Sequence, residues 1–193
     1  MKQLFCTSGL VVLALAGFAA NPAGAATTAA GPYYANPSWD QQLPASTRFV
    51  VLSNWIDAAH PSGGAAVLDR ETGLVWEQSP STSTFTWRVA QVHCHNLNTG
   101  GRLGWRLPIL QELASLVDRS VSPGPTLSSG NPFSNVQSDI ILSNYWSAST
   151  VASETDTGLA WAVRFNDGLV GSVFKSDSLV AWCVRGGQGV DPQ

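Results

Sequence analysis

Alternating apolar and polar residues predict a series of short β-strands along this chain. Runs rich in β-branched and aromatic residues occupy positions 49–52, 66–68, 74–76, 144–149, 159–165, 169–174 and 179–185. The second and third runs flank a polar segment that ends in Gly73, and Asn166-Asp167-Gly168 joins the fifth and sixth, so each pair is predicted to form a β-hairpin. In the last run Cys183 lies opposite three apolar residues, so we expect both faces of that strand to be covered.

Two segments between these strands show the period of an α-helix instead. The first is carried by Trp87, Ala90, Cys94 and Leu97, which share one helical face. It stops at the glycine-containing residues 98–101, and Thr84 or Thr86 is placed to cap its start. The second is carried by Leu110, Leu113, Leu116 and Val117, which follow Pro108. Proline near the first turn is compatible with a helix because its missing N–H would have no partner there.

Residues 120–139 are dense in serine, proline, glycine and asparagine and show no period. A loop of this length in a compact domain is usually functional or disordered. Helices followed by a run of antiparallel strands indicate an α+β domain.

The N-terminal residues have the pattern of a secretory signal peptide. Lys2 precedes an apolar run at residues 10–20, and Ala23-Gly24-Ala25 fits a signal-peptidase site. The run is shorter than the roughly 20 residues of a membrane-spanning helix, so a retained anchor is the less favoured alternative. We predict a signal peptide (1–25), an extended lead-in (26–47), a folded domain (48–186) and a tail (187–193). The protein is then exported, to the periplasm or the cell surface, with no transmembrane anchor.

The charge of the chain restricts its possible binding partners, and its cysteine content predicts a disulfide. Without Lys2 the chain keeps 9 of its 10 Lys+Arg residues against 13 Asp+Glu, and it has no basic run. This composition argues against nucleic acid or anionic membrane as the main partner. Only Cys94 and Cys183 follow the signal peptide, and in an exported chain a disulfide between them is the simplest prediction. Two buried free thiols are the alternative.

Several segments together carry a family resemblance. They are residues 68–76, 104–108, 112–113, 115–118, 145–149 and 183–185. In this order they resemble the Lcl C-terminal domain family, whose best-known member is a collagen-like adhesin that binds host glycosaminoglycans. Ile109 stands where the family often has threonine, and the chain shows no collagen-like repeat. The resemblance implies a C-type lectin-like fold, with two helices packed on antiparallel sheets and one disulfide from the first helix to the last strand.

Possible metal sites each have a simpler explanation. His93 and His95 flank Cys94, but side chains two residues apart on a helix point about 200° apart and cannot chelate one ion. Phe165-Asn166-Asp167 is similar to the Trp-Asn-Asp that ligates calcium in carbohydrate-binding C-type lectins. The companion Glu-Pro-Asn is missing, so a turn is favoured and calcium near Asp167 stays an open alternative. We expect no metal and no cofactor.

Catalytic constellations are not evident in the sequence. Glu112 follows Arg106 closely, and we expect it to pair with that arginine and to favour the start of the second helix rather than act as an acid. No Gly-x-Ser-x-Gly elbow is present, and the three histidines are His60, His93 and His95. Formylglycine-generating enzymes share the C-type lectin-like fold and need reactive cysteines. A disulfide between Cys94 and Cys183 would leave none. We therefore expect a protein that is not an enzyme.

The tryptophans divide into expected core residues and one candidate ligand platform. Trp76, Trp87, Trp105, Trp161 and Trp182 lie in periodic elements and are predicted to be core. Trp146 adjoins a Ser/Thr-rich segment with two carboxylates, which suits sugar stacking, although a buried position is the alternative. The predicted ligand-binding residues are Trp146, Asn131, Asn135, Glu154 and Asp156.

Taken together, these patterns favour a non-catalytic domain that binds an extracellular ligand, with a glycan or another cell-surface molecule as the leading candidate. The alternative is a structural or assembly subunit of a periplasmic or cell-surface complex. The sequence leaves the ligand and the oligomeric state open.

Overall fold

The computed structural model describes residues 43–121, 123–139, 143–152 and 158–186. The predicted signal peptide, most of the lead-in and the predicted tail lie outside these residues. Within them, no helix is long and apolar enough to cross a membrane. The fold is α+β, with short helices and two sheets, as the sequence predicts.

The first sheet contains both ends of the described chain. Its strands are β1 (Phe49–Val51), β2 (Ala66–Asp69), β3 (Leu74–Glu77) and β9 (Val184–Arg185), in the order β1-β2-β3-β9 and all antiparallel. The predicted β2–β3 hairpin is confirmed, with Val67 opposite Trp76. Gly73 closes its turn at a φ of 72°, which glycine adopts without strain, and donates its N–H to Asp69 O at 2.8 Å.

The second sheet is built from the C-terminal strands and one short early strand. The strands are β4 (Thr84–Phe85), β8 (Leu179–Val180), β5 (Asn144–Thr150), β6 (Leu159–Arg164) and β7 (Val170–Phe174), in the order β4-β8-β5-β6-β7. The predicted β6–β7 hairpin is confirmed. The sheet is not purely antiparallel as predicted, because β5 and β8 pair in parallel at Tyr145 and Val180. Strand β4 is too short to give a period and is missed by the sequence.

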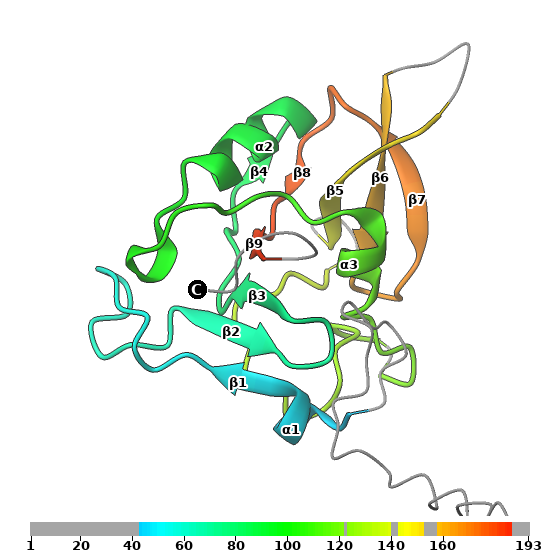
Figure 1. Cartoon of the computed structure of the whole chain (residues 1–193). Coiled ribbons are helices and arrows are strands. Elements are labelled where there is room, and N and C mark those ends of the chain that lie inside the picture. Colours follow the sequence, from blue (N-terminus) through cyan, green and yellow to red (C-terminus); the bar gives the residue numbers. More distant parts are fainter. Residues whose placement is uncertain (1–42, 122, 140–142, 153–157, 187–193) are drawn as a thin grey trace, which may run out of the picture. The chain divides into compact units, whose positions relative to one another are not determined.

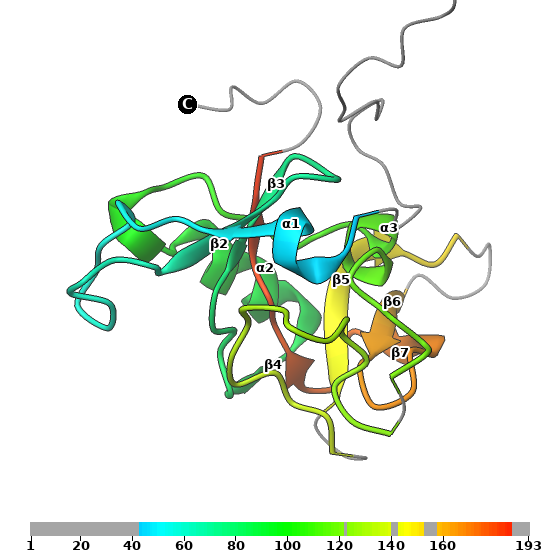
Figure 2. The ribbon, with the colours of Figure 1, turned by 90° about the horizontal axis from the view of Figure 1, so that it is seen from below.

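The prediction of one closing strand over residues 179–185 is wrong. The segment belongs to both sheets: β8 lies beside β5, β9 lies beside β3, and residues 181–183 cross between them (Figures 1 and 2). Glu77 holds the crossing in place, because Glu77 O accepts the Trp182 indole N–H at 2.9 Å and the Glu77 carboxylate accepts the Cys183 N–H at 2.8 Å. A buried chain whose N–H groups bond to a side chain instead of a ladder still satisfies its backbone.

The helices are shorter than their periods suggest. Helix α2 (Trp87–His95) follows Thr86 at its N-cap, although the Thr86 side chain makes no capping hydrogen bond. Helix α3 (Leu110–Ala114) ends before Leu116, whose N–H bonds to Leu113 O, three residues back, at 3.3 Å instead of continuing the helical ladder. Leu116 nevertheless stays in the core. A 3₁₀ turn, η1 (Thr99–Gly101), follows α2.

The predicted extended lead-in ends in a helical turn. Helix α1 (Ala45–Arg48) starts after Pro44, whose carbonyl accepts the N–H groups of Thr47 and Arg48 at 2.9 Å. Arg48 is buried and meets the acidic residues of the β2–β3 turn. Its guanidinium donates to Asp69 at 2.9 and 2.7 Å and lies 3.1 Å from the Glu71 carboxylate. The turn predicted as polar is therefore a buried ion network.

Two clusters of buried side chains form the core. One joins both sheets and α3 through Trp76, Tyr145, Phe165 and Trp182. The other lies around the Cys94–Cys183 disulfide and contains Trp105, Trp146 and small residues of β6. Both faces of the crossing are thus covered, as predicted. Trp76, Trp105 and Trp182 are core as expected, whereas Trp87 and Trp161 are only half-buried.

Candidate functional site

The predicted aromatic platform lies in the core. Trp146 is 0% exposed, and its indole N–H donates to Phe85 O at 2.7 Å. An indole with both faces packed and its one donor satisfied has no surface on which a sugar can stack. Trp146 is therefore a core residue, as the buried alternative has it, and its position gives no support to the predicted ligand contact. Glu154 and Asp156 lie outside the described residues.

The two predicted asparagines belong to a loop that packs beside the end of β3. Asn131 forms a turn with both ends of its amide, donating to Ser128 O at 3.0 Å and accepting the Phe133 N–H at 3.1 Å. Asn135 is exposed and donates to the Ser79 hydroxyl at 2.8 Å. These contacts explain both residues structurally, and neither of them brings the asparagines to Trp146.

The predicted pairing of Glu112 with Arg106 is confirmed. The guanidinium donates to both carboxylate oxygens of Glu112 at 2.7 Å and also to Gly186 O at 2.8 Å. The same carboxylate accepts the Ile109 N–H at 2.8 Å, at the N-terminus of α3. Glu112 thus fixes the helix start in an arginine fork, with both of its carboxylate oxygens accepting hydrogen bonds.

His93 and Asp167, which the sequence offered as possible metal ligands, each contact another side chain of the fold. His93 stacks on Phe85 with ring centroids 4.5 Å apart, and burial lowers its pKa. The Asp167 carboxylate pairs with Arg164 and accepts the Leu169 N–H at 3.1 Å, and the hydrogen bonds from Arg164 are the main cause of its lowered pKa. Among the described residues, no group of three His, Cys, Asp or Glu side chains is placed to hold a metal ion.

The structure does form a concave site at another position, between α2 and the start of α3. We call it the α2–β5 pocket, and its volume is about 590 Å³. Its lining residues are Gln91, Val92, His95, Trp105, Arg106, Leu107, Ile109 and Ala148. Pockets of about 300–1,000 Å³ are usual for small ligands and for inserted side chains.

Apolar side chains dominate this pocket. Val92 on α2 is 51% exposed and Ile109 is 42% exposed, and both face the same space. Val89 lies one helical turn before Val92 and is also exposed, so the apolar surface continues along α2. Apolar residues left open beside a pocket mark binding surfaces more often than scattered exposed ones do.

Polar groups lie among the lining residues but offer little reactivity. They are Gln91, His95 and Arg106. The Arg106 guanidinium is already bonded to Glu112 and to backbone carbonyls, and no lining residue is a serine, cysteine or carboxylate that His95 could activate. The lining therefore offers polar contacts but no nucleophile.

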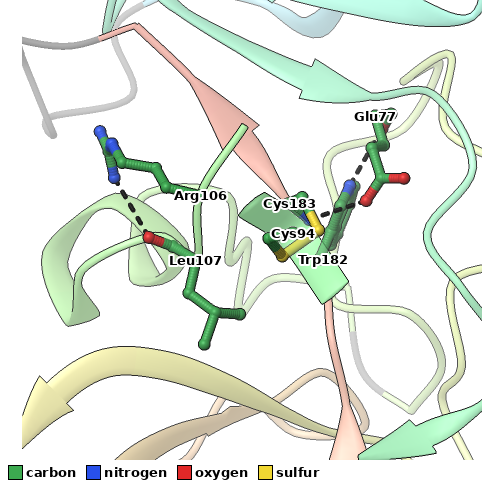
Figure 3. The surroundings of a disulfide bond; sticks show 6 residues. All are labelled: Glu77, Cys94, Arg106, Leu107, Trp182 and Cys183. Atoms are coloured by element: carbon green, nitrogen blue, oxygen red, sulfur yellow. Dashed lines mark hydrogen bonds between the residues drawn. A yellow bond between two sulfur atoms is a disulfide. The ribbon is translucent and has the colours of Figure 1, made fainter. Parts of the chain in front are cut away.

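Its walls are fixed by bonds between distant parts of the chain. The Cys94–Cys183 disulfide ties α2 to the crossing between the sheets, with a Cα–Cα distance of 5.4 Å. Arg106 exchanges two backbone hydrogen bonds of 2.9 Å with Val184, so the segment that carries Leu107 runs beside the disulfide (Figure 3). Ala148 N–H donates to Pro108 O at 2.7 Å. The pocket is therefore preformed.

Sequence reasoning missed this site although it singled out parts of it. The motif at residues 104–108 lines the pocket, but nothing in the sequence shows that Val92 and Ile109 face each other. A signal existed in α2, where Val89 and Val92 lie off the buried face of the helix. Exposed valines one turn apart indicate a second apolar face.

Comparison with known protein families matches residues 65–185 to the Lcl C-terminal domain. A search of curated proteins finds no match. The matched range includes every residue that lines the α2–β5 pocket, and it begins after Arg48 and β1.

Proposed function

Because this chain belongs to the Lcl C-terminal domain family, we propose that it is an exported, non-catalytic binding module that receives an apolar group of its ligand in the α2–β5 pocket. The observation that carries the proposal is a preformed pocket whose mouth exposes Val92 and Ile109. Burying such side chains against a ligand gains about 25 cal/mol per Å² of apolar surface.

The proposed architecture is a C-type lectin-like fold. Its support is the disulfide from the first long helix to the closing segment, together with two sheets that share that segment. Export is supported by the signal-peptide pattern and by the disulfide, since such bonds persist in oxidising compartments.

The lining favours an apolar side chain of a peptide or protein over a sugar. Sugar stacking needs an open aromatic face, and Trp105, the tryptophan that lines the pocket, is buried. Valine, leucine and isoleucine walls instead fit an inserted aliphatic or aromatic group. A glycan ligand, which the family resemblance implies, would need another surface of the domain.

Peptide selection on the purified protein tests the proposal. A random peptide library is panned on the wild-type chain, and selected peptides are then measured on Val92→Glu and on Val170→Glu. Val170 is the matched control, because it is 41% exposed on β7 and does not line the pocket. We expect peptides with an apolar anchor that lose at least about tenfold in affinity on Val92→Glu, since a carboxylate in the pocket must be desolvated.

A glycan array run on the same three proteins provides the opposing outcome. Selective glycan binding that Val92→Glu leaves unchanged would contradict the proposed site and favour a glycan-binding module. The assembly-subunit alternative has its own support in the exposed valines of α2, which a permanent partner would cover. It predicts one stable complex that survives purification from the native host and is lost in Val92→Glu.

A further inference from the structure

A second cavity lies beside η1, with Thr99 in its lining, and differs in chemistry from the first. We call it the Glu77 pocket, and its volume is about 360 Å³. Its lining residues are Asp57, Ala58, Ala59, His60, Ala65, Glu77, Ser79, Leu97, Asn98 and Thr99. It shares no residue with the α2–β5 pocket, so an inference about it stands apart from the proposed function.

Glu77 is a buried carboxyl group with one oxygen open to this cavity. The residue is 5% exposed, and one carboxylate oxygen accepts the Cys183 N–H at 2.8 Å (Figure 3). No described residue donates a hydrogen bond to its other oxygen, and no described cation pairs with it. Burial without a positive partner raises the pKa of Glu77 to about 8, against the smaller lowering effect of the Cys183 hydrogen bond.

The other ionisable groups of the pocket do not supply that partner. One Asp57 oxygen accepts from His60 Nδ1 at 2.9 Å and from the Ala59 and His60 N–H groups, and the second accepts the Gly100 N–H at 2.9 Å. Burial acts to raise the pKa of Asp57, but these hydrogen bonds outweigh it and lower the pKa. Asp57 therefore adds a fixed negative charge beside the cavity, and its bond to His60 occupies the imidazole Nδ1.

The remaining lining suits a short alkyl chain with a polar head. Ala58, Ala59, Ala65 and Leu97 supply small apolar walls. Ser79 and Thr99 supply hydroxyl oxygens, which accept hydrogen bonds as an ammonium group requires. The lining holds the Asp57 carboxylate and no lysine or arginine, so the potential in the cavity is negative even while Glu77 is protonated.

We propose that the Glu77 pocket binds a primary ammonium group on a short alkyl chain, with the open oxygen of Glu77 as its counter-ion. The ammonium comes either from a free small amine or from a lysine side chain of a partner. Binding converts the Glu77 carboxylic acid to carboxylate, and the displaced proton passes to the solvent. The affinity for an ammonium ligand consequently rises with pH. A neutral ligand that accepts a hydrogen bond from the carboxylic acid would show the opposite dependence.

Calorimetric titration of the full chain with n-propylammonium and with Nα-acetyl-lysine methylamide tests the proposal. Below the Glu77 pKa of about 8, affinity should rise about tenfold per pH unit, roughly fifty-fold between about pH 6 and pH 8. Titrations in two buffers of different ionisation enthalpy should show nearly one proton released per amine at about pH 6.5. Binding of the lysine derivative alone identifies a partner side chain as the source, and binding of both identifies a free amine as sufficient.

Substitutions test whether Glu77 itself, rather than a neighbouring residue, binds the amine. Glu77→Gln keeps the acceptor for Cys183 N–H and should abolish binding, whereas Asp177→Asn, the same change at an exposed site outside the pocket, should leave binding as in the wild type. Ala59→Lys, which places a tethered ammonium at the pocket without altering Glu77, should weaken the added amine at least about tenfold. Ala59→Gln is its neutral control and should not.

Four outcomes would overturn the proposal. They are no binding of either amine across the pH range, affinity that falls as pH rises, binding retained in Glu77→Gln, and Ala59→Lys binding like Ala59→Gln. Affinity that falls with pH would mean that the protonated acid donates to a neutral ligand. A pH dependence that persists in Glu77→Gln would assign the titration to a group other than Glu77.

Discussion

Glu77 is a residue whose protonation is coupled to folding. Its pKa is raised from an ordinary value of 4.5 to about 8, mainly by burial. The folded chain therefore binds a proton more tightly than the unfolded chain does. The resulting stabilisation is fully present below about pH 4.5 and is lost as the pH rises to about 8.

Unfolding free energies at two pH values check this sign. We expect the wild type to lose on the order of 3–5 kcal/mol through Glu77 alone between about pH 5 and pH 8. Glu77→Gln, which cannot ionise, should lack this loss and be the more stable protein at about pH 8. Denaturant titrations of both proteins measure the difference. Parallel pH profiles for the two would show that Glu77 titrates normally.

Ile109 is a second residue with a specific energetic consequence. It stands at the N-cap of α3 in an extended conformation, and the Glu112 carboxylate already accepts its N–H. This is one half of a capping box, since isoleucine has no side-chain acceptor for the other half. Threonine, which the family often has here, would supply the missing oxygen.

Threonine and valine have the same shape, so replacing Ile109 by each of them measures the contribution of the threonine hydroxyl to stability. Ile109→Thr should be about 1 kcal/mol more stable than Ile109→Val, because both lose the same methyl group and only threonine caps the helix. Thermal and denaturant unfolding give the comparison. Equal stability of the two variants would mean that the Glu112 carboxylate alone suffices. Ile109→Thr should also weaken apolar ligands of the α2–β5 pocket.

At the scale of elements, the disulfide joins α2 to the crossing between the sheets. The closed loop spans 89 positions, for which the chain-entropy model gives a stabilisation of about 4–5 kcal/mol. We expect Cys94→Ala with Cys183→Ala to lower the melting temperature clearly, and reduction of the wild type to lower it equally. Calorimetry of the three samples tests this. Equal melting temperatures with and without the bond would contradict it.

The buried ion network predicts a sharp contrast between two neighbouring arginines. Arg48→Met leaves Asp69 and Glu71 buried without their cation and should cost about 3–5 kcal/mol. Arg70→Met, an exposed position in the same turn, should change stability by less than about 0.5 kcal/mol. Denaturant unfolding measures both. A small effect of Arg48→Met would mean that water reaches the carboxylates.

Elements with a clear period could be predicted, and those without one could not. The β2–β3 and β6–β7 hairpins follow from alternation around turn residues that end in Gly73 and Gly168. The division of residues 179–185 between two sheets does not, because two-residue ladders carry no period. The same holds for β4. The burial of Asp69 and Glu71 was missed because it depends on Arg48, which lies 21 residues before Asp69.

At the scale of the whole molecule, the folded unit begins before the family match. The match starts at residue 65, whereas β1 pairs with β2 and Phe49 packs in the core. A chain of residues 43–186 should therefore fold, and one of residues 65–186 should not, since it lacks Arg48 and exposes the β2 edge. Circular dichroism and proteolysis of both fragments decide it. A cooperative transition in the shorter fragment would contradict the expectation.

The candidate site could be predicted only in part, because its walls come from segments that the fold brings together. The disulfide pair and the Arg106–Glu112 pair follow from residue type and spacing. The α2–β5 pocket does not, because Val92 and Ile109 meet only when β5 and the disulfide place their segments. Trp146 allowed two interpretations, a ligand platform or a buried residue, and the neighbouring sequence does not decide between them, whereas its packing in the fold makes it core.

The disulfide also determines how the protein responds to mechanical tension between its ends. Force applied to the chain passes from α2 to β9 through the Cys94–Cys183 bond, so the residues between the two cysteines cannot be stretched while it is intact. At about 3.4 Å per residue, the 89-position loop withholds roughly 300 Å of extension. In single-molecule pulling, the extension gained on unfolding should be shorter by this length for the oxidised protein than for the reduced one. Of the residues that line the α2–β5 pocket, Gln91 and Val92 therefore lie on the path that bears the load, whereas the others lie in the loop that the disulfide shields from it.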